Sequence, residues 1–540
     1  MSRALATACV AALGVACAPP PADLSIVNAR VFTGDDARPW ADAVAVRGDR
    51  VVAVGPVASI DALGAPRHGR IDAGGRVVVP GLNDARVRVD VAPDAARLAL
   101  GDDPSIEDLD AALARAVAAP PLDRPIRGVI GPAAWDDRRL SRAWLDARVP
   151  DRPVWLSLAD GHERLLNSAA LSLVGLTDDA RPPEGGRVGR DPAGRLDGRL
   201  EGYAGMLADR RLAAAVDAAT AASRFRAFAD QALRVGVTSV HLVADQLPVA
   251  ETVRRILDAG TSIRWRVSRA PLGEAGRDLT DSRPHLPPQP APTMDVRGMV
   301  WVVDGTIAVR GAWLRAPYAD RPDDAGRARL APERLALIAG WAYGSEDPLA
   351  VHAAGDGAAE AVLAALERAG RPEVWRAKRP RLERALLLTP DLRARAHALG
   401  VVTVYVPSRL AIRAVLEARL GPARSGHVQP LRSIVDEGIA LALGSDGALD
   451  PFDGVLRAST GAVNPAEALT REQAVIAYTR GSAYAEFADR DKGRLAPGAL
   501  ADLAVLSADP FTAPPQAVSA IRSLLTMVGG RVVYRSGDLP

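Results

Sequence analysis

Two arginines placed two residues apart are the side chains best arranged for chemistry. Residues 79–88 read Val-Pro-Gly-Leu-Asn-Asp-Ala-Arg-Val-Arg, so Arg86 and Arg88 occupy alternate positions. Alternate residues of a strand face the same side, and both guanidinium groups can therefore reach one point. Arginine stays protonated and has no lone pair for a metal, whereas its planar fork pairs with carboxylates and phosphates. The pair indicates ion pairing or recognition of an anion.

Other reactive groups are sparse. The only cysteines, Cys9 and Cys17, lie in the N-terminal leader, and no Gly-x-Ser-x-Gly pattern occurs, so nucleophilic thiol or serine chemistry is not indicated. We expect His162 and His241, near strand ends, to face a pocket. The other histidines divide into one that ends an apolar segment, His352, and four expected to face solvent, His68, His285, His397 and His427.

The pattern of apolar residues predicts an α/β fold. Short alternating segments, with two hairpins, occupy both ends of the chain and predict a small β-sandwich built from residues 24–80 and 490–540. Between them, apolar strands alternate with alanine-rich helical stretches such as 217–233 and 358–368. The predicted strands are 153–158, 236–242, 299–303, 349–352, 401–406 and 440–443. Repeated βα units over this length predict a TIM-type (β/α)8 barrel with insertions across residues 81–489.

The N-terminus is typical of an exported protein. Arg3 precedes an apolar run, and a small residue before Cys17 is followed by Ala-Pro-Pro-Pro. We expect residues 1–17 to be a lipoprotein signal with Cys17 as the lipidated residue, and residues 18–23 to be a linker. The expected location is the cell envelope, with a periplasmic or secreted protein as the alternative. Membrane contact is expected only through the lipid, because no other segment reaches the ~20 apolar residues of a span.

Several motifs in order resemble those of the amidohydrolase superfamily, in particular long bacterial members such as N-acyl-amino-acid deacylases and N-substituted formamide deformylases. The matching segments span nearly the whole mature chain. They are Asp160-Gly161-His162 with Asn167-Ser168, Asp304-Gly305 with Pro317-Tyr318-Ala319-Asp320, Val351-His352 with Gly355-Asp356, Gly444-Ser445-Asp446, and the glycine- and leucine-containing tail 493–503. The resemblance implies metal-dependent hydrolysis of carbon–nitrogen bonds other than peptide bonds.

Most metal-ligand positions implied by this resemblance carry other residues. The paired histidines of the first barrel strand correspond to Arg86 and Arg88. The bridging lysine corresponds to Val300, and two further histidines to Arg384 and Arg409. His352 and Asp446 remain, with Asp446 also at the position of the general base. A catalytic zinc takes about three protein ligands and an open position, so two are too few for a tight site.

Three functional hypotheses follow. The leading one is a degenerate, metal-poor amidohydrolase that binds a small anionic molecule through Arg86, Arg88, His162, Arg384 and Arg409. The second is an active hydrolase with a rearranged single-metal site on His352 and Asp446, using zinc or another divalent ion, with Asp84, Glu201 or Asp304 as added ligands. The third is a structural lipoprotein with an unused barrel. A net charge of +2 offers no case for nucleic acid as a partner.

Overall fold

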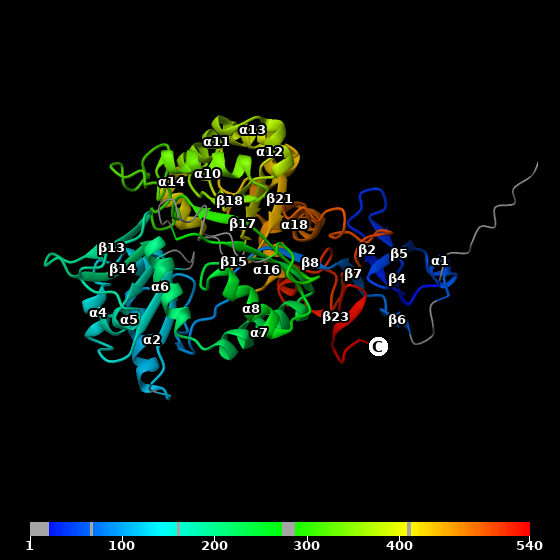
Figure 1. Cartoon of the computed structure of the whole chain (residues 1–540), viewed down its shortest axis with the longest axis horizontal. Coiled ribbons are helices and arrows are strands. Elements are labelled where there is room, and N and C mark those ends of the chain that lie inside the picture. The colour runs from blue at the N-terminus through cyan, green and yellow to red at the C-terminus, as the bar shows by residue number, and fades with distance from the viewer. Residues whose placement is uncertain are drawn as a thin grey trace, which may run out of the picture.

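The computed structural model describes residues 21–64, 69–121, 123–158, 163–272, 287–407 and 412–539. Its centre is an eight-stranded parallel sheet in the order β21-β20-β19-β18-β17-β16-β15-β8, and β21 also lies against β8. Figure 1 shows this barrel between a β-rich end and a large inserted region. The strands are β8 (Leu82–Val87), β15 (Val237–Ala244), β16 (Arg264–Arg269), β17 (Met294–Val302), β18 (Leu349–His352), β19 (Arg381–Glu383), β20 (Val402–Tyr405) and β21 (Ala440–Leu443). The predicted barrel fold is confirmed.

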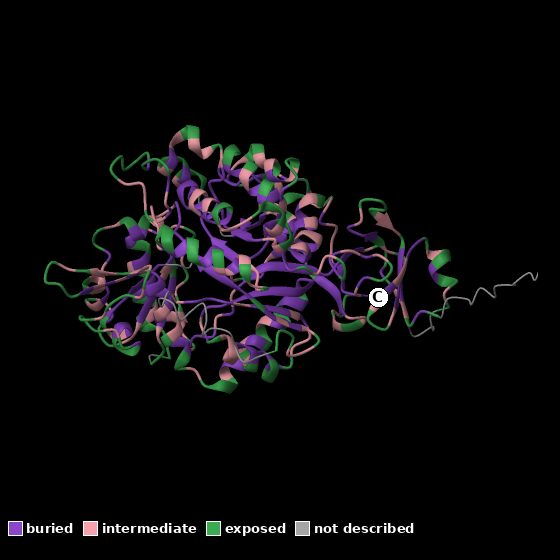
Figure 2. Cartoon of the chain, turned by 45° about the horizontal axis from the view of Figure 1, so that its top comes forward, coloured by how far each residue is buried: buried purple, intermediate pink, exposed green. Residues whose placement is uncertain are grey.

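Helices cover the outside of the barrel. Each of the two predicted helical stretches forms a helix, α7 (Ala218–Arg234) and α11 (Asp356–Ala369), and Asp217 caps α7 by accepting the Thr220 N–H. Strands buried on both faces appear purple in Figure 2. The other helices of this part of the chain are α8 (Val249–Ala259), α10 (Pro332–Gly344), α12 (Pro372–Lys378), α13 (Pro390–Leu399), α14 (Arg413–Ser425), α15 (Leu431–Asp436), α16 (Pro451–Thr460), α17 (Arg471–Ile476) and α18 (Ser482–Ala485).

A second, six-stranded sheet is inserted between β8 and β15. Its order is β13-β14-β12-β11-β10-β9. The predicted strand 153–158 belongs here, as β11, and not to the barrel, because it pairs with β10 and β12. The elements are β9 (Ala96–Arg97), α2 (Ile106–Ala118), β10 (Ile126–Ile130), α3 (Pro132–Asp136), α4 (Arg142–Asp146), β11 (Val154–Leu158), β12 (Arg164–Leu166), α5 (Ser168–Leu173), β13 (Gly186–Arg190), β14 (Leu196–Gly202) and α6 (Tyr203–Ala214).

The two ends of the chain build two further sheets on a shared apolar core. One has the order β5-β4-β1-β6, and the other, β24-β23-β22-β7-β2-β3, joins both termini because β22 pairs with β7. Asn28, whose φ is +50°, separates the first two strands of the chain. The strands are β1 (Leu24–Val27), β2 (Arg30–Phe32), β3 (Trp40–Ala41), β4 (Ala43–Arg47), β5 (Arg50–Gly55), β6 (Arg70–Asp72), β7 (Val77–Pro80), β22 (Leu503–Leu506), β23 (Ser523–Val528) and β24 (Arg531–Arg535), with α1 (Val57–Asp61) and α19 (Pro515–Val518) beside them.

Among the described residues, none of the helices combines the length and apolarity that a bilayer crossing needs.

Candidate functional site

Arg86 lies near the carboxyl end of β8 with its side chain fully buried. Its Nη1 donates to the Glu383 carboxylate at the end of β19, and its Nε lies 3.3 Å from Asp446 Oδ1. Burial lowers the pKa of Arg86 to about 10 although Asp446 opposes the shift, so the guanidinium stays charged at neutral pH. Burial of this charge is tolerable because two carboxylates face it.

Asp446, directly after β21, is the centre of the cluster. Besides Arg86, its carboxylate lies 3.3 Å from Arg88 Nε and 3.4 Å from Arg384 Nη1. The Asp446 N–H donates to the Arg86 carbonyl at 2.8 Å, which ties the two ends of the barrel sheet together. Asp446 and Arg384 both have positive φ, +48° and +55°. Such backbone is uncommon for residues other than glycine and persists where surrounding contacts hold it.

Arg88 extends the cluster to the next strand. Its Nε lies 3.0 Å from Asp245 Oδ2, just beyond β15. Burial raises the pKa of Asp245, and Arg88 opposes that shift. The structure thus brings together three of the predicted arginines with Asp446. Two carboxylates that the sequence analysis did not single out, Asp245 and Glu383, complete their ion pairing.

His352 ends β18 and is completely buried. Its Nε2 lies 3.9 Å from Asp304 Oδ1. Asp304 accepts the N–H groups of Ala354 at 2.8 Å, Gly355 at 2.9 Å and Trp313 at 3.0 Å. Burial, then the nearby Arg384 and Arg86, hold the pKa of His352 well below its ordinary value, so the ring is neutral. Burial raises the pKa of Asp304 to about 7 despite these hydrogen bonds.

The other proposed carboxylate ligands have structural contacts. Asp84 accepts the Ser445 hydroxyl at 2.5 Å and the N–H groups of Ser445 and Arg86 at 3.0 and 3.1 Å. Burial raises its pKa to about 7. Glu201 is in the inserted sheet, where it contacts Arg187 and Arg327. Within the described ranges, no three His, Cys, Asp or Glu side chains converge as a metal site would require.

Four remaining predictions concern single positions. Val300, at the position of the bridging lysine, is buried in the apolar core around β17. His162 and Arg409 lie outside the described residues. His241 is buried in the interior of the barrel, in the middle of β15.

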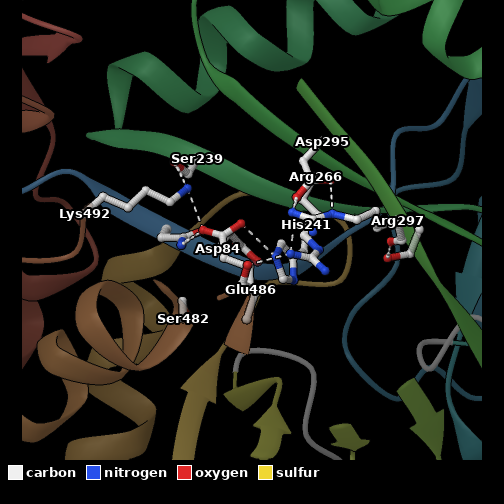
Figure 3. A network of polar contacts seen from close by, with 12 residues as sticks. Asp84, Ser239, His241, Arg266, Asp295, Arg297, Ser482, Glu486 and Lys492 are labelled. Carbon is white, nitrogen blue, oxygen red and sulfur yellow. Dashed lines mark hydrogen bonds and ion pairs between the residues drawn. The ribbon is translucent and has the colours of Figure 1, made fainter. Parts of the chain in front are cut away.

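Below the mouth, a polar network fills the barrel interior (Figure 3). Glu486 is its hub: it lies 2.9 Å from His241 Nε2 and 2.5 Å from Lys492 Nζ. Arg381 donates to His241 Nδ1 and lies 2.7 Å from Glu383, the residue that also pairs with Arg86. A continuous path of polar contacts therefore joins Lys492 to Asp446.

Within this path the hub ionises readily. Burial opposes ionisation of Glu486, but Lys492 and His241 lower its pKa below the usual range. The network could have been recognised in the sequence from the charged residues inside the short strands β16 and β19. The pattern of apolar residues did not single out these strands.

A cavity of about 500 Å³ opens above the cluster, between the barrel mouth and the inserted sheet. Arg384 belongs to its wall, whereas Arg86 and Arg88 are not among the lining residues. The inserted sheet contributes Arg97, Leu98, Arg127, Val129 and Ser157, and the barrel side contributes Leu386, Val406, Ile412, Arg413, Arg457 and Val463 among others. Its size is within the range of small-molecule sites.

Comparison with known proteins gives a consistent result. The amidohydrolase family profile matches residues 70–534. The protein LONG AFTER FAR-RED 3 of Arabidopsis thaliana is 28% identical over 95% of this chain and 92% of its own length. The N-substituted formamide deformylase of Arthrobacter pascens is 27% identical over 96% and 99%. An uncharacterized metal-dependent hydrolase from Pyrococcus horikoshii superposes with a TM-score of 0.69 at 22% identity, covering 91% and 99%, and this likeness concerns the fold.

Proposed function

Because the chain belongs to the amidohydrolase family, we propose that it has lost metal-dependent hydrolysis and binds a small anion at the mouth of its barrel. One observation carries the proposal. The carboxylate of Asp446, at a position where the family holds its metal, is contacted by the guanidinium groups of Arg86, Arg88 and Arg384. These groups supply the positive charge that a divalent ion would otherwise supply.

The residues present do not fit a metal ion. A zinc site needs about three ligands with available lone pairs, and a guanidinium has none. A cation placed beside Asp446 and His352 would also face the charges of Arg86 and Arg384, which already oppose protonation of His352. The alternative of a hydrolase using His352 and Asp446 with one metal is therefore less well supported.

Charge at the cluster favours an anion. Four guanidinium groups, from Arg86, Arg88, Arg381 and Arg384, meet three carboxylates, from Asp245, Glu383 and Asp446. The Arg384 side chain reaches the cavity, where its fork can take a second carboxylate or phosphate. Arg384 is thus the residue of the cluster through which an anion would bind.

Two measurements on the purified mature protein test the proposal. The first is elemental analysis after incubation with zinc and dialysis, for which we expect far less than one equivalent. The second is thermal melting with phosphate and acetate, for which we expect a rise in melting temperature that Arg384→Met removes. Stoichiometric zinc, or melting that no anion changes, would contradict the proposal.

The route to the cell envelope is part of the same proposal. We propose export with Cys17 as the lipidated residue, supported by the leader sequence alone. Anchoring by lipid would place the barrel and its cavity outside the cytoplasm.

A further inference from the structure

One face of the inserted sheet is only partly covered by helices: Trp155 of β11 packs against α5 and α6, whereas Val129 of β10, on the same face, is exposed. Successive residues of a strand point to opposite faces. On β10, Ile126 and Ile130 are buried in an apolar cluster with Leu109 and Leu113 of α2. Val129, between them on the other face, is 51% exposed. The helices α2 and α4 cover the opposite face, where Leu109, Leu113 and Leu145 join the same apolar cluster as Ile126 and Ile130.

The exposed part of this face of the inserted sheet forms a wall of the cavity at the barrel mouth. Arg127 and Val129 of β10 and Ser157 of β11 line it from the sheet, while Arg384 and Val406 line it from the barrel. The exposed valine therefore faces this cavity of about 500 Å³, which is partly open to solvent.

The wall of the cavity also carries apolar side chains. Ile412, at the start of α14, is 40% exposed and lines the same cavity as Val129. Leu98, Leu100 and Val309 lie in this wall and are half-buried. Exposed large apolar side chains that gather in one concave site mark a binding surface.

The charged part of the wall is almost entirely cationic. Among the described residues of the wall, the arginines are Arg97, Arg127, Arg384, Arg413 and Arg457, and the one carboxylate is Asp102. Outside the wall, Arg97 and Arg127 share a single acid, Asp90. Arg413 and Arg457 pair with Glu417 and Asp453 on their own helices. Within the wall, arginines therefore outnumber carboxylates.

We infer that the ligand of this cavity is an amphiphilic anion. Its carboxylate or phosphate head binds between Arg384 and Arg127, and its apolar body lies against Val129 and Ile412. This inference rests on the proposed function and assigns the inserted sheet, which the proposed function leaves unused, as the part of the site that selects the apolar body.

Calorimetric titration of the full mature chain tests the selection. The probes are octanoate and octyl phosphate, their chain-free counterparts acetate and inorganic phosphate, and neutral octanamide. We expect octanoate or octyl phosphate to bind at one site about tenfold or more tighter than its chain-free counterpart, because the chain buries apolar surface. Octanamide is expected to bind at least about tenfold more weakly than octanoate, because it lacks the charge that pairs with arginine.

A matched pair of variants locates the site. Val129→Asp places a carboxylate on the cavity wall at an exposed position, and we expect it to weaken octanoate binding about tenfold or more. The control is Val532→Asp, at a strand valine of β24 that is 40% exposed and outside the cavity, which should leave binding unchanged.

The outcomes separate this inference from the proposed function. Two results would contradict the role of the inserted sheet: octanoate binding no tighter than acetate, or Val129→Asp leaving octanoate binding unchanged. If Arg384→Met still weakens the binding of every anion, the proposal of anion binding at the mouth stands. If no anion binds, both are wrong.

Discussion

The substitution Asp446→Asn distinguishes a charge-paired cluster from a disabled metal site. The amide keeps the size of the side chain, and asparagine tolerates positive φ, so the backbone at +48° is not newly strained. What changes is the charge: three guanidinium groups lose the carboxylate that lies 3.3 to 3.4 Å from them.

The magnitude follows from burial and from the remaining partners. Removing one partner of a buried ion pair costs about 3–5 kcal/mol, because the opposite charge stays in the interior. Arg86 keeps Glu383 and Arg88 keeps Asp245, which limits the loss. We therefore expect the free energy of unfolding to fall by about 3 kcal/mol, the lower end of that range.

Urea unfolding at pH 7, followed by the fluorescence of the nine tryptophans and by circular dichroism, measures this change. The control is Asp258→Asn, which removes an ion pair to Arg255 on the surface of α8, where the aspartate is 54% exposed, and should alter stability little. The double variant Asp446→Asn/Arg384→Met should recover part of the loss, because it also removes one facing charge.

Equal stability of the parent and Asp446→Asn, within about 0.5 kcal/mol, would refute the reasoning. That result would mean that Asp446 does not neutralise the arginines in the folded protein. The interpretation of the cluster as a replacement for a metal would then fail as well.

Three further predictions follow from the same contacts. Burial, with Arg381 adding to it, lowers the pKa of His241. The free energy of unfolding of the parent should therefore fall below pH 6.5, by up to about 1.4 kcal/mol per pH unit relative to that of His241→Gln. Urea unfolding between pH 7 and 5 should show the difference in stability between the two proteins narrowing, and a constant difference would contradict this prediction. The triple variant Arg86→His/Arg88→His/Arg384→His places three imidazoles beside His352 and Asp446. Elemental analysis should find zinc in this variant and not in the parent; equal zinc contents would show that replacing these three residues is not enough to restore a metal site. Radiolabelled palmitate should be incorporated in a bacterial expression host by the parent and not by Cys17→Ser, and equal labelling would exclude Cys17 as the anchor.

Much of the fold could be predicted from local patterns. Strands such as β18 and β21 are buried on both faces and therefore consist of short apolar runs. The capping aspartate Asp217 marks the start of α7. The pattern of apolar residues did not predict the strands β16 and β19, because these strands carry arginine and glutamate side chains that point into the polar interior of the barrel.

The membership of the two sheets could not be predicted in the same way. The apolar run 153–158 has the composition of a barrel strand, yet it pairs with β10 and β12 in the inserted sheet. Pairing depends on which strands meet after the chain has folded, and the composition of one strand does not carry that information. The cavity wall that includes Val129 follows from this arrangement.

At the candidate site, the residue types of Arg86 and Arg88 already exclude metal ligation, because a guanidinium group has no lone pair for a metal wherever it lies. Their actual partners depend on the tertiary contacts. Arg86 meets Glu383, 297 residues away in the sequence, and Asp446 contacts three arginines. Only closure of the barrel brings β8, β19 and β21 to one end, and only there do the four guanidinium groups lie within ion-pair distance of the three carboxylates.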